Sequence, residues 1–183
     1  MNADSPTSQS HRLLAGDRSG PNTQISLPVV LVLDRLRSAF NVGNIFRLAE
    51  AARAERIIAC GYTAAPPHPK LEKSARGCDR LVPCTRASNA SEAIADLREH
   101  GYTIYVVETV EGALPVWDVV MRFPAAFVLG NEALGVGADT LCRGDQAVCL
   151  PCFGVKNSIN VGNCAAVVLY EALRQWLTAR LRL

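Results

Sequence analysis

Short, continuous apolar runs separated by helical segments constrain the fold of this chain more than any other feature. The first run is Val-Val-Leu-Val-Leu at residues 29–33. Further apolar runs are predicted to be strands at residues 56–60, 81–84, 102–107, 125–129 and 147–150. Continuous β-branched runs of this length are typical of strands covered on both faces, and such strands occur mainly in parallel sheets.

Helical patterns lie between these runs. Residues 44–54 and the segment from Val161 onward each carry an apolar stripe at helical spacing. Asn89 and Glu92, three positions apart, are typical of a capping box and predict a helix that ends at Gly101. Strands alternating with helices predict an α/β fold, with a parallel sheet covered by helices on both faces.

The length of 183 residues suits one domain. Residues 1–26 are polar and rich in Pro, Gly and Ser, which predicts a disordered N-terminal tail, so the folded domain is expected over residues 27–183. No apolar run approaches the ~20 residues of a membrane span, and the tail lacks the apolar core of a secretory signal. We therefore expect a cytoplasmic protein with no membrane partner.

The formal net charge of +2 conceals an uneven distribution. Residues 34–86 contain ten Lys or Arg against five Asp or Glu, whereas residues 87–183 contain seven against ten. A basic amino half suits a polyanionic partner such as RNA. A solvated charged face explains the surplus nearly as well, so charge alone leaves both interpretations open.

Seven cysteines are an odd number for a disulfide framework. Cys149 and Cys152 form a C-x-x-C pair, but no second pair stands at zinc-ribbon spacing, and the three histidines are distant in sequence. Several of the cysteines fall inside apolar runs, where a free thiol behaves as a small hydrophobic side chain. We expect reduced thiols and no metal.

Two polar segments follow predicted strands. In residues 41–47, Asn41 is predicted to cap a helix and Gly43 to permit a close backbone approach, while Arg47 lies on the polar stripe. In isolation, this segment is more typical of a capped helix with a surface arginine than of a site. Residues 129–135 begin at the carboxyl end of a strand, where open α/β sheets bind ligands. Their glycines miss the G-x-G-x-x-G spacing, so a nucleotide-dependent oxidoreductase is poorly supported.

The third polar segment, residues 150–163, leads into the last helix. Ser158 or Asn160 could cap that helix. Capping requires only one such residue, yet Asn157 and Asn163 crowd the same turn. The surplus of hydrogen-bonding groups indicates a ligand.

Taken in order along the chain, the three polar segments closely resemble the three motifs of the SpoU (TrmH-like) RNA ribose 2′-O-methyltransferases, which belong to the SPOUT superfamily. The matching patterns are N-x-G-x-x-x-R, L-G-N-E-x-x-G and L-P-x-x-G-x-x-x-S-I-N-V. The resemblance covers residues 29–176. It implies an α/β domain with a C-terminal trefoil knot, S-adenosyl-L-methionine as cofactor, tRNA or rRNA as substrate, and a homodimer as the active unit. A non-catalytic RNA-binding module that kept the fold is the alternative.

The resemblance also implies roles for individual residues. The polar active-site positions are Asn41, Arg47, Glu132, Ser158 and Asn160. The cofactor positions are Glu108, Thr109, Leu129, Gly130, Leu150, Pro151, Ser158 and Ile159, and the amino end of the last helix is expected to offer free N–H donors to the cofactor's carboxylate. The candidates for contacts with RNA phosphates are Lys70, Lys73, Arg76 and Arg80. Many family members have Ser and Met where this chain has Gly162 and Cys152.

Family proposals make the arginine of the first motif a general base, but guanidinium is almost never deprotonated in proteins. We therefore hypothesise that Arg47 clamps a phosphate and stabilises the developing 2′-alkoxide, acting in a homodimer on the cofactor of the other subunit. Glu132 is expected to orient Arg47 or Asn41. The joint presence of Arg47, Glu132, Ser158 and Asn160 favours an enzyme over a binding module.

Overall fold

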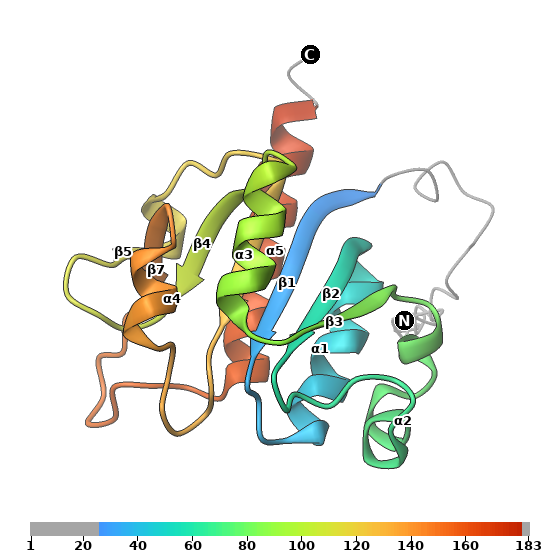
Figure 1. The fold of residues 1–183 in the computed structure, drawn as a ribbon. Coiled ribbons are helices and arrows are strands. Elements are labelled where there is room, and N and C mark those ends of the chain that lie inside the picture. Colours follow the sequence, from blue (N-terminus) through green and yellow to red (C-terminus); the bar gives the residue numbers. More distant parts are fainter. Residues whose placement is uncertain (1–25, 181–183) are drawn as a thin grey trace, which may run out of the picture.

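A computed structural model describes residues 26–180, so the predicted tail lies outside the described residues except for Ser26. A single sheet runs through this part of the chain, with strands in the order β3-β2-β1-β6-β4-β7-β5 (Figure 1). All neighbouring strands pair in parallel. The strands are β1 (Leu27–Asp34), β2 (Ala54–Cys60), β3 (Cys84–Ala87), β4 (Thr103–Val107), β5 (Leu114–Pro115), β6 (Ala125–Leu129) and β7 (Gln146–Cys149).

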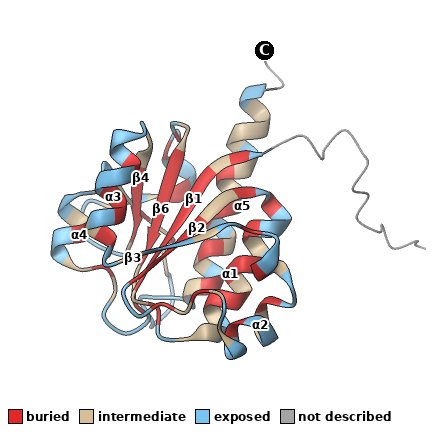
Figure 2. Ribbon diagram, turned by 45° about the vertical axis from the view of Figure 1, so that its right-hand side comes forward, coloured by how far each residue is buried: buried red, intermediate tan, exposed pale blue. Residues whose placement is uncertain are grey.

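Helices cover both faces of this sheet (Figure 2). The helices are α1 (Ala39–Ala52), α2 (Pro69–Ala75), α3 (Ala90–Glu99), α4 (Ala138–Cys142) and α5 (Val161–Arg180), with short 3₁₀ turns η2 (Cys78–Arg80) and η3 (Val116–Asp118). Buried side chains of α1, α2 and α5 form one core with one face of the sheet, and those of α3 form a second core with the other face. The predicted α/β architecture is confirmed.

Strand β1 shows why the apolar runs are continuous. Leu31 and Leu33 belong to the core shared with α1 and α5, whereas Val30 and Val32 belong to the core shared with α3. All four side chains are completely buried. Burying each such side chain stabilises the fold by about 1.5–3 kcal/mol, so a central strand gains from apolar residues at every position.

Three local predictions are confirmed and one is wrong. Asn89 Oδ1 accepts a hydrogen bond from the Glu92 N–H at 2.9 Å, as expected for the cap of α3, and α5 begins at Val161. Gly101 has a positive φ of 81° directly after the end of α3. Asn41, however, does not cap α1. The cap is Ser38, whose side chain accepts from the Asn41 N–H, so α1 begins earlier and carries Asn41 in its first turn.

The strand predicted at residues 81–84 is displaced toward the carboxyl side, to Cys84–Ala87. Pro83 has no N–H to donate to a ladder, and its carbonyl accepts from the Ile57 N–H at 2.9 Å. Pairing with β2 therefore starts at that carbonyl and continues from Cys84 onward.

Candidate functional site

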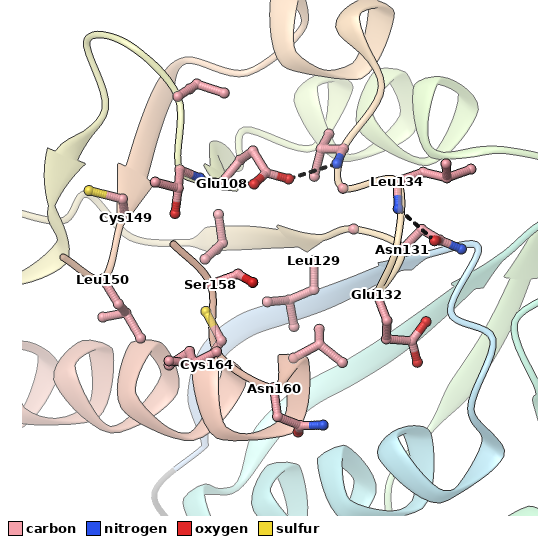
Figure 3. Close-up of a pocket in the computed structure, with 18 of the residues that line it drawn as sticks. Glu108, Leu129, Asn131, Glu132, Leu134, Cys149, Leu150, Ser158, Asn160 and Cys164 are labelled. Atoms are coloured by element: carbon pink, nitrogen blue, oxygen red, sulfur yellow. Dashed lines mark hydrogen bonds between the residues drawn. The ribbon is translucent and has the colours of Figure 1, made fainter. Parts of the chain in front are cut away.

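A cavity of about 670 Å³ opens at the carboxyl ends of β4, β6 and β7 (Figure 3). Its walls are the residues that follow these strands together with the first turn of α5 and the segment before it. The volume lies within the range of small-molecule sites, and the carboxyl edge is where parallel α/β sheets bind ligands.

Close backbone packing shapes the loop after β6. A Cβ atom at Gly130 would lie 2.6 Å from the backbone of both Gly135 and Val136, so no other residue fits without moving the loop. Asn131 holds the turn from inside, because its Oδ1 accepts the Leu134 N–H at 2.9 Å and its backbone carbonyl accepts the Gly135 N–H at 2.9 Å. Gly135 adopts a φ of +66°, which favours glycine.

Glu108, which follows β4, fastens the same loop. Its Oε2 accepts the Val136 N–H at 2.8 Å, and its Oε1 accepts the Thr109 N–H at 2.9 Å (Figure 3). A side chain at Gly135 would meet Glu108 Oε2 at 2.5 Å. The carboxylate therefore holds two loops of the cavity together.

The walls combine apolar side chains with backbone polar groups. Leu129 and Leu150 are buried, and Ile159 is about half exposed across the cavity. Every residue predicted to contact a cofactor lines this cavity except Pro151. The lining also contains three thiols, those of Cys149, Cys152 and Cys164, of which only Cys152 was expected near the cofactor. Only their positions in the sequence could have indicated that the other two thiols line the cavity. Cys149 ends a strand, and Cys164 lies one turn after Asn160 in α5.

Two of these thiols, Cys149 and Cys164, are poor nucleophiles in this setting. Burial raises the pKa of Cys164 to about 11, and burial likewise raises the pKa of Cys149. At neutral pH both side chains are uncharged, so they form a weakly polar wall.

Glu132 joins the first polar segment to the second. Its Oε2 accepts the Arg37 N–H at 2.8 Å, and its Oε1 accepts the Ser38 N–H at 3.1 Å and Asn41 Nδ2 at 2.9 Å. Burial would raise the pKa of this carboxyl, but the hydrogen bonds from Arg37, Asn41 and Ser38 outweigh it and hold the pKa below its ordinary value. Glu132 is therefore an anion at neutral pH that positions Asn41 and not Arg47.

Asn160 connects the third segment to this network. Its Nδ2 donates to Asn41 Oδ1 at 3.1 Å, and its Oδ1 accepts the N–H groups of Gly162 at 2.9 Å and Asn163 at 3.4 Å. We expected free N–H donors at the start of α5. This expectation is wrong for two of these donors, because the Asn160 side chain already accepts hydrogen bonds from them. We call the chain of side chains Glu132–Asn41–Asn160 the polar triad.

Arg47 lies elsewhere, in a second cavity of about 750 Å³ between α1, α2 and the residues after β2. The structure brings Arg47 together with Lys70, Lys73 and Arg76 there, and we call this the basic cavity. Arg80 is exposed but is not part of its lining. Within the described residues, no hydrogen bond or ion pair engages the Arg47 side chain.

Gly43 explains how the basic cavity forms. A Cβ atom at this position would lie 2.0 Å from Ser74 Oγ and 2.8 Å from the Ala75 nitrogen, so glycine allows α2 to pack directly on α1. Ser74 Oγ in turn donates to the Ala39 carbonyl at 3.1 Å. The close backbone approach predicted for Gly43 is confirmed, and it sets the cations of α2 beside Arg47.

Residues 26–180 contain neither a membrane-spanning helix nor a cluster of metal ligands. No helix in that range is both long and apolar enough to cross a membrane. No group of three or more His, Cys, Asp or Glu side chains there is arranged to hold a metal ion.

Comparison with known proteins gave consistent matches. Residues 28–170 match the model of the SpoU rRNA Methylase family. The chain is 33% identical over 156 residues to the 23S rRNA (uridine(2479)-2′-O)-methyltransferase of Streptomyces viridochromogenes, which covers 82% of this chain and 54% of that protein. It is 32% identical over 158 residues to the 23S rRNA (guanosine-2′-O-)-methyltransferase RlmB of Vibrio parahaemolyticus, which covers 86% of this chain and 63% of that one.

The fold has matches among solved structures as well. The AdoMet-bound rRNA methyltransferase from Sinorhizobium meliloti superimposes with a TM-score of 0.76 at 26% identity, over 85% of this chain and 60% of the other. The chain thus spans less than two thirds of the length of each of these relatives.

Proposed function

This chain belongs to the SpoU rRNA Methylase family, and from that premise we propose that it transfers a methyl group from S-adenosylmethionine to a ribose 2′-hydroxyl of rRNA or tRNA. The observation that carries the proposal is the polar triad, which joins all three motif segments beside the cavity at the carboxyl edge of the sheet. The names of the two rRNA 2′-O-methyltransferase relatives support the reaction, and the AdoMet-bound relative supports the cofactor. An RNA substrate favours a cytoplasmic location.

The larger features of the first cavity fit S-adenosylmethionine. Leu129, Leu150 and Ile159 provide apolar surfaces suited to a flat adenine, and the surrounding loops provide backbone N–H and C=O groups for its edge. Glu108 and Thr109 border the same space as candidates for the ribose hydroxyls. When bound, the cofactor supplies a methyl group on a sulfonium, which is already a good leaving group.

The remaining tasks are alignment and removal of the 2′-hydroxyl proton. Alignment of two reactants alone can contribute about 7–11 kcal/mol to the lowering of a barrier. Glu132 fixes the Asn41 side chain and Asn41 fixes Asn160, so this network presents amide groups in a set orientation. Ser158, whose hydroxyl has no hydrogen-bond partner among the described residues, lines the cavity and can contact ribose or cofactor. These residues position the reactants.

Arg47 is the candidate for stabilising charge. Because arginine in proteins carries a positive charge on a planar fork of donors, we assign Arg47 to clamping the phosphate next to the target ribose and to stabilising the developing alkoxide. Lys70, Lys73 and Arg76 line the same basic cavity and extend the positive surface along the RNA backbone, and Arg80 is an exposed outlying candidate.

Because Arg47 lines a different cavity from the one assigned to the cofactor, we propose a homodimer in which Arg47 of one copy serves the cofactor cavity of the other. Exposed apolar side chains at Phe153, Val155, Val167 and Tyr170 support an interface between copies. The trefoil knot remains a proposal for the segment 150–160, supported by the family and by its position beside the loop after β6.

Replacement of Arg47 by lysine tests the role of the arginine. Lysine could act as a base but could not form a two-pronged clamp, so we expect kcat to fall at least about 10-fold with little change in cofactor affinity. The assay is 2′-O-methyl nucleoside mass spectrometry after incubation with RNA and S-adenosylmethionine. Arg143→Lys, at the C-cap of α4 on the opposite face of the sheet, is the matched control. Retention of most of the kcat would refute the clamp.

Calorimetry with S-adenosylmethionine separates the enzyme from the alternative function. A methyltransferase must bind the cofactor with the affinity of a specific ligand. RNA binding without any cofactor binding would instead support a non-catalytic RNA-binding module.

A further inference from the structure

Two aromatic side chains in the basic cavity are left open to solvent. Phe40, in the first turn of α1, is 73% exposed, and Tyr62, just after β2, is 61% exposed. Both line the basic cavity with Arg47. An exposed phenylalanine adds nothing to the core, so its position in a cavity indicates a contact that the isolated chain does not make.

The ring of Tyr62 is held in place although it is exposed. Its hydroxyl accepts a hydrogen bond of 2.8 Å from Asn131 Nδ2. Asn131 is only 4% exposed, and its Nδ2 also donates to the Arg35 carbonyl at 2.7 Å. A ring anchored at its hydroxyl loses little conformational freedom when a ligand covers its face, so it is suited to stacking.

The charge around these rings has a single sign. The basic side chains that line the cavity are those of Arg37, Arg47, Lys70, Lys73 and Arg76. Among its described lining residues there is no Asp or Glu. Proteins bind single-stranded nucleic acid with surfaces of this kind, in which unneutralised cations alternate with exposed aromatic rings. The cations contact phosphates, and the rings stack on bases.

Resting on the proposed function, we propose that Phe40 and Tyr62 stack on unpaired bases of the RNA at or next to the methylated nucleotide. The substrate is then a loop, bulge or single-stranded region, because the faces of bases inside a duplex are covered by their neighbours. Tyr62 also ties this contact to the loop that borders the cofactor cavity, since its partner Asn131 lines that cavity.

The test uses a single-stranded RNA of about eight nucleotides that carries the fluorescent base 2-aminopurine, and a hairpin with the same base inside its stem. Fluorescence anisotropy measures affinity, and quenching of 2-aminopurine reports stacking. We expect the wild-type protein to bind and quench the single strand and to bind the hairpin stem more weakly. Phe40→Ala and Tyr62→Ala should each weaken binding about 10-fold and reduce quenching at saturation. Tyr62→Phe, which keeps the ring, should retain most of the quenching.

Two controls separate stacking from charge and from general damage. Lys73→Gln should weaken binding and leave the quenching at saturation unchanged, because it removes only a phosphate contact. Trp117→Ala removes an aromatic side chain of comparable exposure from a different surface and should change neither quantity.

Several outcomes would overturn the inference: wild-type protein that does not bind the single strand, equal affinity for the hairpin stem, or alanine variants that bind and quench as the wild type does. A dimer that dissociates when Phe40 is replaced would assign that ring to the interface between copies. Competition by an acidic peptide as strong as that by RNA would indicate a protein partner.

Methyl transfer is measured separately on the same proteins. Absence of methylation with normal quenching would refute the proposed function alone, whereas normal methylation by both alanine variants would refute the stacking alone.

Discussion

Replacement of Glu132 by glutamine removes the charge at the point where the first two motif segments meet. The two carboxylate oxygens accept three hydrogen bonds, from the N–H groups of Arg37 and Ser38 and from Asn41 Nδ2. Glutamine keeps only one acceptor oxygen. Whichever way its amide turns, its NH₂ group faces at least one backbone N–H, so at least one bond is lost and the others weaken.

The expected cost follows from these bonds. A hydrogen bond to a charged group contributes about 1.5–3 kcal/mol, and one between neutral groups about 0.5–1.5 kcal/mol. Because the Glu132 side chain is largely accessible to water, water replaces part of what is lost. We expect a loss of about 1–2 kcal/mol in the free energy of unfolding, or about 3–6 °C in Tm for a domain of this size.

The dependence on pH distinguishes this mechanism from simple loss of packing. The pKa of Glu132 is lower in the folded protein than its ordinary value of 4.5, so the carboxylate stabilises the fold fully above that value. This contribution is lost as the pH falls through the folded pKa. The difference between wild type and Glu132→Gln should therefore be largest near pH 7 and shrink as the pH falls below 4.5.

Urea unfolding at a series of pH values measures both quantities. Glu111→Gln, which neutralises an exposed carboxylate in the loop after β4, is the matched control and should change stability by less than about 0.5 kcal/mol. A Glu132→Gln protein as stable as the wild type, or a difference that is the same at both ends of the pH range, would refute this reasoning.

Three further outcomes follow from other contacts. Gly43→Ala should destabilise the protein by about 1–2 kcal/mol in urea unfolding, because overpacking against Ser74 at 2.0 Å outweighs the better helix propensity of alanine. Gly130→Ala should abolish S-adenosylmethionine binding in calorimetry, since the added Cβ meets the Val136 nitrogen at 2.6 Å and displaces the loop. Lys73→Gln should reduce the slope of log affinity for single-stranded RNA against log salt by about 0.7, and an unchanged slope would remove Lys73 from the phosphate contacts.

The sequence predicted the centre of the sheet well because β1, β2, β4 and β6 are buried on both sides, so that their hydrophobicity is continuous and hard to mistake. The elements it missed are those without such a signal. Strand β5 is a two-residue pair, Leu114–Pro115, and its position depends only on pairing with β7. Helices α2 and α4 are short, and α2 carries more polar than apolar residues, so neither shows an apolar stripe.

For the candidate site, the order of the motifs predicted which loops meet but not which side chains contact one another. The partner of Glu132 could not be chosen between Asn41 and Arg47 from sequence, because both are polar residues of the same segment, six positions apart. The start of α1 at Ala39, set by the cap at Ser38, places Asn41 in the first turn, toward the loop after β6. Arg47 consequently lies beside α2. The residue at which α1 begins, which the motif does not specify, therefore decided which side chain Glu132 contacts.

Gly162 of α5, where many family members have serine, lies close to two asparagine side chains. A Cβ atom at Gly162 would lie 2.8 Å from Asn44 Nδ2 and 3.1 Å from Asn160 Oδ1. Gly43, the residue before Asn44 in α1, lies closer still to α2, since a Cβ atom there would lie 2.0 Å from Ser74 Oγ. Two consecutive residues of α1 therefore fix α5 on one side and α2 on the other. Because α5 begins at the proposed cofactor cavity and α2 borders the basic cavity, the packing of α1 on both helices connects the two cavities, and we expect a change in either contact to affect both.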